Sequence, residues 1–260
     1  EKEIKMDTFE LIVIGGGPGG YLAAERAGHA GLKTMCIEKR AYGGVCLNEG
    51  CVPSKTLLNS AKVLDYANHA AAYGVKVEGS ATIDHKAVVA RKNKVVSTLV
   101  GGISAMMKAN KVTVVNGAGV LKDKTHIEVN GEVYEGKNII IATGSEAVVP
   151  PIEGVKEGVE NGFVLTNREI LDLEEVPAKL AIVGGGVIGL EMASYFNSVG
   201  SEVTVIEMLD KIAGPTDAEI SSILKKNYED KGVKFMLGTK VTAIKDGAVF
   251  YEGGSVPADK

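Results

Sequence analysis

The chain of 260 residues is long enough for one large or two ordinary domains, and 45% of its residues are hydrophobic. Its net charge of -4 predicts no basic surface for nucleic acid, and no apolar run approaches the roughly 18 residues of a membrane-spanning helix. Three cysteines are too few for a secreted disulfide framework, and the charged N-terminus is unlike a signal peptide. We therefore expect a cytoplasmic α/β protein; the residues before Thr8 indicate a tag remnant, a start region or a linker.

The first predicted unit runs from Phe9 to Glu38 and consists of a strand, a glycine-rich loop, a helix and a second strand. Its loop has the spacing G-x-G-x-x-G, formed by Gly15, Gly17 and Gly20. One such glycine permits a tight turn, one lets a pyrophosphate approach the backbone, and one lets the helix pack closely on the strand. Glu38 ends the second strand, where a carboxylate accepts hydrogen bonds from a ribose. The alternative for Glu38 is a solvated strand end.

A run that begins at Gly43, GGVCLNEGCVPSK, places two cysteines close to this loop. Cys46 and Cys51 are five positions apart, and Lys55 follows four positions later. Two close cysteines beside a nucleotide-binding loop indicate a dithiol/disulfide pair that passes electrons to a bound cofactor, and a helix start with a nearby cation favours the reactive thiolate. The alternatives are half of a zinc site, for which no second cysteine or histidine pair exists, and two unrelated structural thiols. No metal site is predicted, and Cys36 is assigned to core packing.

The middle of the chain predicts two helices, followed by a hairpin-rich insert. Apolar residues recur at helical spacing over 53–73 and over 84–110. The dipeptide Asn130-Gly131 predicts a hairpin turn, and Pro150-Pro151 begins a turn-rich stretch that marks a domain boundary. Short strands are predicted in KVTVVNGAGVL from Lys111, THIEVN from Thr125 and EVYEGKNIIIATGS from Glu132.

The segment from Lys179 to Glu207 repeats the plan of the first unit. Its G-x-G-x-x-G loop consists of Gly184, Gly186 and Gly189. Glu207 follows the first of these glycines by 23 residues, as Glu38 follows the first glycine of its own loop. Two matches, each flanked by a strand, a helix and an acid, predict two dinucleotide sites. A carboxylate at Glu207 repels a 2′-phosphate, which favours NAD over NADP. The last residues, GGSVPADK, indicate a connection into a further strand.

These motifs together resemble the pyridine-nucleotide disulfide oxidoreductases, a family of flavoproteins. The resemblance covers the chain from about Thr8 to its end and is carried by GGGPGGY, GGVCLNEGCVPSKTLL, IIIATGS and GGGVIGLEMAS. The cysteine motif is its specific part. Ser54 before Lys55 is similar to members that oxidise dihydrolipoyl groups, whereas glutathione reductases typically carry lysine at that position. Glu49 stands where many members have a small aliphatic residue.

The resemblance implies an α/β fold with two Rossmann-like dinucleotide-binding domains of three-layer ββα architecture. Residues 8–150 would form the FAD-binding domain and residues 151–260 the NAD-binding domain. The implied FAD contacts are Gly15, Gly17, Gly20, Glu38, Lys39, Lys55, Gly119, Thr143, Gly144 and Ser145. The implied NAD contacts are Gly184, Gly186, Gly189, Glu207 and Val241.

The resemblance also implies an activity, in which electrons pass from dihydrolipoyl groups of 2-oxo-acid dehydrogenase complexes through a Cys46–Cys51 disulfide and FAD to NAD+. Cys51 would lie against the flavin and Cys46 would exchange with substrate. Lys55 would lie near the flavin, paired with Glu191; an ordinary ion pair is the alternative. Two other functions stay open: a related flavin disulfide reductase with a mercuric or other thiol substrate, and a non-catalytic nucleotide-binding fragment.

One part of the family pattern does not occur in the sequence. Members of the family supply a catalytic histidine from the partner subunit in a H-P-T-x-x-E setting, and this chain has no such motif. We therefore expect that the C-terminal dimerisation domain is absent here and that the full-length protein is a homodimer. We also expect that these 260 residues alone do not turn over lipoamide at a family rate.

Overall fold

A computed structural model describes residues 7–260, which divide into two compact units. The first unit comprises residues 7–53 and 93–146, and the second comprises residues 54–92 and 147–260. The division after Glu146 lies close to the boundary expected at residue 150. Residues 54–92 were expected in the first domain but group with the second, because Leu57 and Ala61 join the buried cluster around Phe196. Of the residues before Thr8, only Asp7 lies within the described part of the chain.

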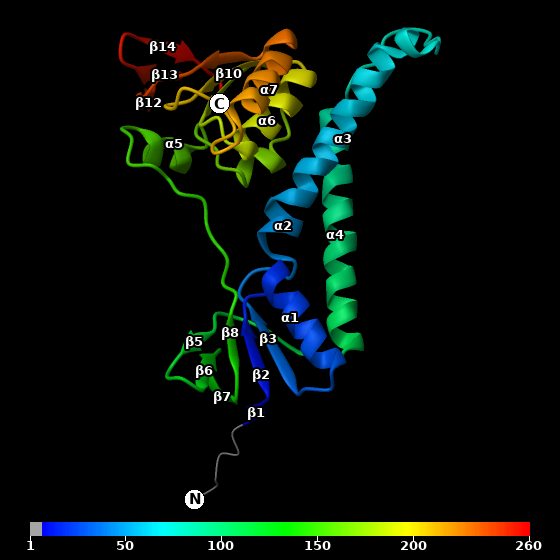
Figure 1. The fold of residues 1–260 in the computed structure, drawn as a ribbon, viewed down its shortest axis with the longest axis vertical. Helices are drawn as coiled ribbons and strands as arrows, with labels where there is room; N and C mark the ends of the chain where they lie inside the picture. The colour runs from blue at the N-terminus through cyan, green and yellow to red at the C-terminus, as the bar shows by residue number, and fades with distance from the viewer. Residues whose placement is uncertain (1–6) are drawn as a thin grey trace, which may run out of the picture. The chain divides into compact units, whose positions relative to one another are not determined.

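The first unit is built on a parallel sheet of four strands in the order β4-β3-β2-β8 (Figure 1). Successive side chains of a strand point to opposite faces, and the buried strand β2 shows the consequence. Leu11 and Val13 pack towards the helices, whereas Ile12 and Ile14 pack towards a second sheet. The four strands are β2 (Leu11–Ile14), β3 (Thr34–Glu38), β4 (Thr113–Asn116) and β8 (Ile139–Ile141).

The second sheet of this unit has the order β1-β7-β6-β5 and forms the outer layer. Ile127 and Val129 of β6 pack against the first sheet. The predicted hairpin turn is confirmed, because Asn130 and Gly131 have φ values of +54° and +84° between β6 and β7. The strands are β1 (Thr8–Phe9), β5 (Val120–Leu121), β6 (His126–Val129) and β7 (Glu132–Gly136).

Helices form the third layer of the first unit. Ala24 of α1 (Pro18–His29) and Met107 of α4 (His85–Ala109) are buried against the face that carries Leu11 and Val13. The two helices predicted over 53–73 and 84–110 are confirmed as α3 (Cys51–Asn68) and α4, and a short 3-10 turn, η1 (Ala70–Tyr73), follows α3.

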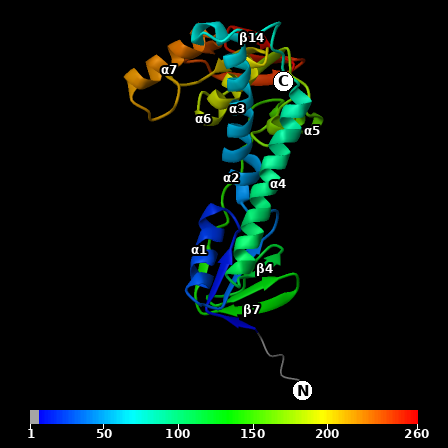
Figure 2. The ribbon, with the colours of Figure 1, turned by 90° about the vertical axis from the view of Figure 1, so that its right-hand side faces the viewer.

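The second unit is built on a parallel sheet of three strands in the order β11-β10-β9. The helix α6 (Val187–Ser198) buries Tyr195 and Phe196 against Leu180 and Val203 of the sheet, and α7 (Ala218–Asp230) follows it along the chain (Figure 2). The strands are β9 (Lys179–Val183), β10 (Glu202–Ile206) and β11 (Lys234–Met236).

An antiparallel meander packs on the other side of this sheet, with Val241, Ile244 and Val249 in one buried cluster with Ile206. The meander consists of β12 (Val241–Lys245), β13 (Ala248–Tyr251) and β14 (Gly254–Pro257). The prediction of a connection in GGSVPADK was therefore wrong in part: Gly254–Pro257 is a strand because it pairs with β13 and packs Val256 on the cluster.

Two short helices lie in segments for which the sequence predicted no helix. The turn-rich stretch after Pro151 contains α5 (Val155–Asn161), which forms because Val155 is buried against the meander cluster. The second, η2 (Glu169–Asp172), buries Ile170 and Leu171 beside α6. Both units thus have two sheets and a helical layer, and the predicted α/β fold with three-layer ββα domains is confirmed.

The internal repeat extends beyond the two glycine-rich loops. β6 and β7 begin at residues 126 and 132, and β13 and β14 begin at 248 and 254, a constant separation of 122 residues. A backbone hydrogen bond repeats in the same way. Ile12 N donates to Asn138 O in the first unit and Ala181 N donates to Lys260 O in the second, and the two acceptors are again 122 residues apart. The second unit is therefore a structural repeat of the first.

Candidate functional site

The loop between β2 and α1 has the features required to hold a pyrophosphate. Gly15 has φ +110°, a conformation that L side chains rarely adopt, and a Cβ on Gly20 would lie 1.7 Å from the Gly15 carbonyl oxygen. The helix α1 begins after Gly17 without a side-chain cap and without an acidic residue in its first turn. Its first amide groups and the positive end of its dipole therefore favour an anion at this position.

Glu38 is fixed at this loop by both of its carboxylate oxygens. Oε2 accepts a hydrogen bond from Gly16 N at 2.7 Å, and Oε1 accepts one from Arg40 N at 2.7 Å. Each oxygen has a further lone pair, so the carboxylate can still accept a hydrogen bond from a ribose hydroxyl. Neighbouring Lys39 is mostly exposed, and its Nζ lies 3.8 Å from Glu146 Oε1. The Rossmann-type groups of the first unit thus fit a dinucleotide such as FAD.

The other residues predicted to contact FAD lie where the remaining strands end. Gly119 lies between the two sheets, where a Cβ would come 3.3 Å from the side chain of Ile14. The exposed tripeptide Thr143-Gly144-Ser145 follows β8, and a Cβ on Gly15 would lie 3.2 Å from Thr143 N. The carboxyl ends of parallel strands are where α/β folds bind nucleotides. These positions fit the prediction, and the contact with FAD itself stays a prediction.

The helix that carries Cys46 begins directly on the glycine-rich loop between β2 and α1. Gly43 N donates to Gly16 O at 2.8 Å, and a Cβ on Gly44 would lie 2.6 Å from the Cα of Gly17. The φ values of Gly43 and Gly44 are +95° and +57°, so both glycines have left-handed backbone. Only residues without a side chain allow this approach, and it places α2 (Gly44–Glu49) against the loop.

The two cysteines of the motif occupy different positions. Cys46 is half-buried in α2, and Cys51 is exposed as the first residue of α3. Cys36, Cys46 and Cys51 are present as thiols, so a disulfide between Cys46 and Cys51 stays a prediction.

Cys36 has a different environment. It is completely buried in β3, and this burial, together with the charge of Glu38, raises the pKa of its thiol to about 12. A thiol with this pKa is protonated and unreactive at neutral pH. The assignment of Cys36 to core packing is therefore confirmed.

The expected ion pair between Lys55 and Glu191 is present. Lys55 Nζ lies 2.6 Å from Glu191 Oε1, and both residues belong to the second unit. The Lys55 side chain is 61% exposed, so solvent screens the charge interaction. The contact of Lys55 with FAD stays a prediction.

The second glycine-rich loop has the geometry of the first. Gly184 has φ +108°, and a Cβ on Gly189 would lie 2.4 Å from the Gly184 carbonyl oxygen. Glu207 accepts hydrogen bonds from Gly185 N at 2.7 Å and from Leu209 N at 2.8 Å. The helix α6 begins after Gly186, again without a side-chain cap. The loop therefore fits a second dinucleotide.

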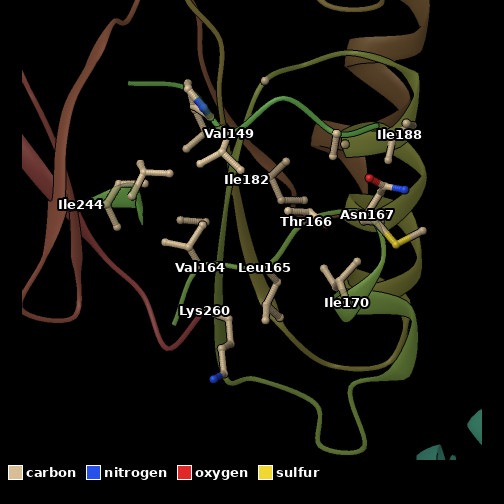
Figure 3. A pocket seen from close by; sticks show the side chains of 18 of the residues that line it. Val149, Val164, Leu165, Thr166, Asn167, Ile170, Ile182, Ile188, Ile244 and Lys260 are labelled. Atoms are coloured by element: carbon tan, nitrogen blue, oxygen red, sulfur yellow. The ribbon is translucent and has the colours of Figure 1, made fainter. Parts of the chain in front are cut away.

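An apolar cavity of about 600 Å³ lies beside this second loop (Figure 3). Its walls come from β9, the start of α6 and the chain segment before α5, including Ile182, Ile188 and Val149. Val241, predicted to contact NAD, is buried in the meander core with its side chain among apolar residues. Any contact of Val241 with NAD would therefore involve its backbone.

Two features of the site were not anticipated. The Gly43-Gly44 turn had no predicted role, although a glycine pair after a strand is a signal for left-handed backbone. The guanidinium of Arg40 contacts the carboxylate of Glu49 with two nitrogens, a pairing that sequence spacing does not reveal.

A search of residues 7–260 finds no group of three or more histidine, cysteine or acidic residues that would hold a metal ion. No helix within the same range has the length and apolar character needed to cross a membrane.

Comparisons with known proteins agree with these motifs. A family model described as pyridine nucleotide-disulphide oxidoreductase matches residues 9–259. Dihydrolipoyl dehydrogenase of Acholeplasma laidlawii is 45% identical over 94% of the chain, which spans 72% of that relative. The same-named protein of Mycoplasma pneumoniae is 43% identical over 97% of the chain, which spans 56% of it. A solved structure, the HOCl-induced flavoprotein disulfide reductase RclA of Escherichia coli, is similar with a TM-score of 0.82 and 29% identity, over 96% of this chain and 55% of that one.

Proposed function

Because this chain belongs to the pyridine nucleotide-disulphide oxidoreductase family and is a homologue of dihydrolipoyl dehydrogenase, we propose that it carries the electron-transfer part of such an enzyme. Electrons would pass from dihydrolipoyl groups through Cys46 and Cys51 to FAD and then to NAD+. The observation that supports this most is the contact of Gly44 with Gly17, which starts the cysteine helix on a dinucleotide-binding loop.

The sulfur chemistry is a thiol–disulfide exchange. A thiolate of the dihydrolipoyl group attacks Cys46 Sγ, the bond between Cys46 and Cys51 breaks, and Cys51 leaves as a thiolate. The second thiol of the substrate then attacks the mixed disulfide and releases Cys46. The substrate loses two electrons and two protons and becomes a cyclic disulfide, while the two cysteines gain the electrons as a dithiol. The half-buried Cys46 would exchange with substrate, as the family resemblance implies.

The two cofactors, when bound, would supply the remaining chemistry, which is acceptance of an electron pair by a flavin and of hydride by a nicotinamide. The first loop and Glu38 would hold FAD, and the second loop and Glu207 would hold NAD. Each carboxylate accepts hydrogen bonds from two backbone amides. Binding of a ribose would therefore cost little side-chain entropy.

The similarity to dihydrolipoyl dehydrogenases supports dihydrolipoyl groups as the substrate. The chain spans 72% of one such relative and 56% of another, so the activity of the whole protein is part of the proposal. The resemblance to the family is the basis for proposing 2-oxo-acid dehydrogenase complexes as partners and a homodimer as the full-length protein.

The test is an anaerobic two-electron reduction of the chain loaded with FAD. We expect a long-wavelength absorption band to develop in the wild type on reduction, because the disulfide takes the electron pair and the Cys51 thiolate then lies beside oxidised FAD. Cys46→Ser should show the band before any reduction, and Cys51→Ser should lack it in both states, because Cys51 is the sulfur assigned to the flavin. Cys36→Ser is the matched control, since Cys36 is buried in β3, and it should keep the band. A band that survives in Cys51→Ser would contradict the assignment.

A second measurement addresses the substrate and the nicotinamide. Dihydrolipoamide, glutathione and mercuric ion should be compared on the full-length gene product, each with NAD+ or NADP+ or the reduced forms. We expect dihydrolipoamide with NAD+ to give the highest kcat/KM. A preference for NADP+ would contradict the role given to Glu207.

A further inference from the structure

A bidentate ion pair connects the segment between the two redox cysteines to the end of β3. Arg40 Nη1 lies 3.4 Å from Glu49 Oε2, and Arg40 Nη2 contacts Glu49 Oε1. The Glu49 side chain is 20% exposed and that of Arg40 is 47% exposed, so the carboxylate is the more sheltered partner. The fork geometry of guanidinium and carboxylate adds orientation to the charge attraction.

Arg40 is itself held in place by the nucleotide site. Its backbone N donates to Glu38 Oε1 at 2.7 Å, and the other oxygen of Glu38 accepts from Gly16 N. The ion pair with Glu49 therefore starts from a residue that is anchored on the dinucleotide loop. A movement of this loop would be transmitted to the end of α2.

The other end of α2 is held by different contacts. Gly43 N donates to Gly16 O, and Asn48 Nδ2 donates to the carbonyl oxygens of Tyr42 and Gly44 at 3.1 and 2.9 Å. Backbone and amide contacts thus fix the start of α2. The contact with Arg40 fixes its end. Cys46 lies between the two attachments.

The charge of Glu49 bears on both cysteines. Cys46 precedes Glu49 by three residues on α2, a spacing that places two side chains on one helix face with their Cβ atoms about 5–6 Å apart. Cys51 follows Glu49 by two residues. A bare carboxylate here would disfavour a thiolate on either cysteine. The other charged side chain nearby in the chain is Lys55, one turn along α3 from Cys51, which pairs with Glu191.

We propose that Arg40 and Glu49 are positioning residues for the two cysteines. Because the charges of Arg40 and Glu49 neutralise each other, Cys46 can form its thiolate, and the bidentate contact fixes the end of α2. This inference rests on the proposed function, because it assigns the ion pair to the cysteines that would carry the electrons. The small aliphatic residue that many family members carry at position 49 would need no such partner.

The test compares Arg40→Met, Glu49→Gln and the double variant in the reduced chain without cofactor. The readout is the rate of Cys46 alkylation by iodoacetamide at pH 7, resolved by peptide mass spectrometry, with buried Cys36 as the internal unreactive thiol. Loss of Arg40 removes the guanidinium charge beside Glu49, so we expect alkylation to slow by about threefold. Loss of the Glu49 charge leaves Arg40 in excess, so we expect alkylation to accelerate by about threefold. The double variant should return close to the wild-type rate.

Changes of opposite sign in the alkylation rates of the two single variants distinguish charge compensation from a purely structural role. If the ion pair only stiffened α2, both single variants would loosen it and change the rate in the same direction. That result, or no change in either, would overturn the proposal. Arg40→Lys keeps the charge without the fork and should retain most of the wild-type rate.

A matched control uses another ion pair of the first unit. Lys122, which follows β5, has its Nζ 2.8 Å from Oε2 of Glu128 on β6, and neither strand carries a cysteine. Lys122→Met and Glu128→Gln make the same changes in net charge and should leave the alkylation rate unaltered.

Failure of this inference can be distinguished from failure of the proposed function. Oxidation of the wild-type chain with a small disulfide asks whether Cys46 and Cys51 form a bond at all. If they do not, the redox role fails, whatever the alkylation rates show. If they do and the rates of the variants do not diverge, only the role of Arg40 and Glu49 fails.

Discussion

At Gly15 and Gly184 the backbone has nearly the same conformation, with φ values of +110° and +108°, but the surroundings of the two glycines differ. A Cβ on Gly15 would lie 2.0 Å from the carbonyl oxygen of Ala142, which follows β8. A Cβ on Gly184 would have no atom of the described chain within 4 Å. At Gly15 the positive φ and the Ala142 carbonyl both exclude a side chain, and at Gly184 the positive φ excludes one.

The largest expected effect compares Gly15→Ala with Gly184→Ala. Both substitutions force an alanine into a conformation that costs about 1–3 kcal/mol. Gly15→Ala must in addition displace the Ala142 carbonyl, so we expect it to cost at least about 2 kcal/mol more than Gly184→Ala. Pulse proteolysis in urea, with cleavage sites of each unit identified by mass spectrometry, measures both losses. Equal losses would mean that Ala142 moves aside freely.

The next comparison uses the two acids that anchor the loops. In Glu38→Gln and Glu207→Gln, one carboxylate oxygen becomes an NH2 group that faces a backbone N–H, so one of two charge-assisted hydrogen bonds is lost. We expect Glu38→Gln to weaken FAD binding by about 2 kcal/mol, or about 30-fold, and to leave NAD binding unchanged. Glu207→Gln should do the reverse. Titrations followed by flavin and nicotinamide fluorescence measure each affinity. A variant that weakened both ligands equally would contradict the assignment of one loop to each.

Much of this comparison could be predicted from the sequence, because it depends on local rules. The spacing of glycines fixes where a turn needs positive φ, and the continuous apolar run LIVI predicts a strand buried on both faces. The acid at the end of the next strand follows from the geometry of a βαβ unit. These are short-range signals, and the anchored carboxylates of Glu38 and Glu207 are their direct result.

The parts that the sequence did not predict depend on distant partners. The helix α5 forms in a turn-rich stretch because Val155 finds a cluster more than 50 residues away in β10 and the meander. Residues 54–92 group with the second unit because Leu57 packs with α6. Arg40 pairs with Glu49 only because the Gly43-Gly44 turn folds α2 back on the loop. Periodicity describes one segment at a time and carries no information on such partners.

The two units also differ in the buried groups that respond to alkaline pH. Burial raises the pKa of Cys36 from 9.0 to about 12 in the first unit and that of Tyr195 from 10.0 to about 12 in the second. In each case the folded state keeps a proton that the unfolded state releases. Stability is therefore fully present below the unfolded pKa and is lost as pH rises towards the folded pKa.

The difference between the two ordinary pKa values sets the order in which the units lose stability. Between pH 9 and 10 we expect the contribution of Cys36 to fall by about 1 kcal/mol, and that of Tyr195 to fall by only about 0.3 kcal/mol. Pulse proteolysis at pH 8, 9 and 10 measures both units. Cys36→Ala should remove this dependence in the first unit. If the dependence persists in Cys36→Ala, another group of that unit is responsible.

The smallest expected effect concerns the equivalent turns between β6 and β7 and between β13 and β14. Asn130 has φ +54° and its side chain donates to Asn116 O at 2.8 Å, whereas Glu252 is not among the non-glycine residues with positive φ. Alanine tolerates left-handed backbone less well than asparagine, so Asn130→Ala should lower the free energy of unfolding by about 1 kcal/mol. Glu252→Ala at the matching position should change it by less than about 0.5 kcal/mol. Urea denaturation of the two variants measures the difference. Equal effects would mean that the left-handed backbone at Asn130 adds no measurable cost for alanine.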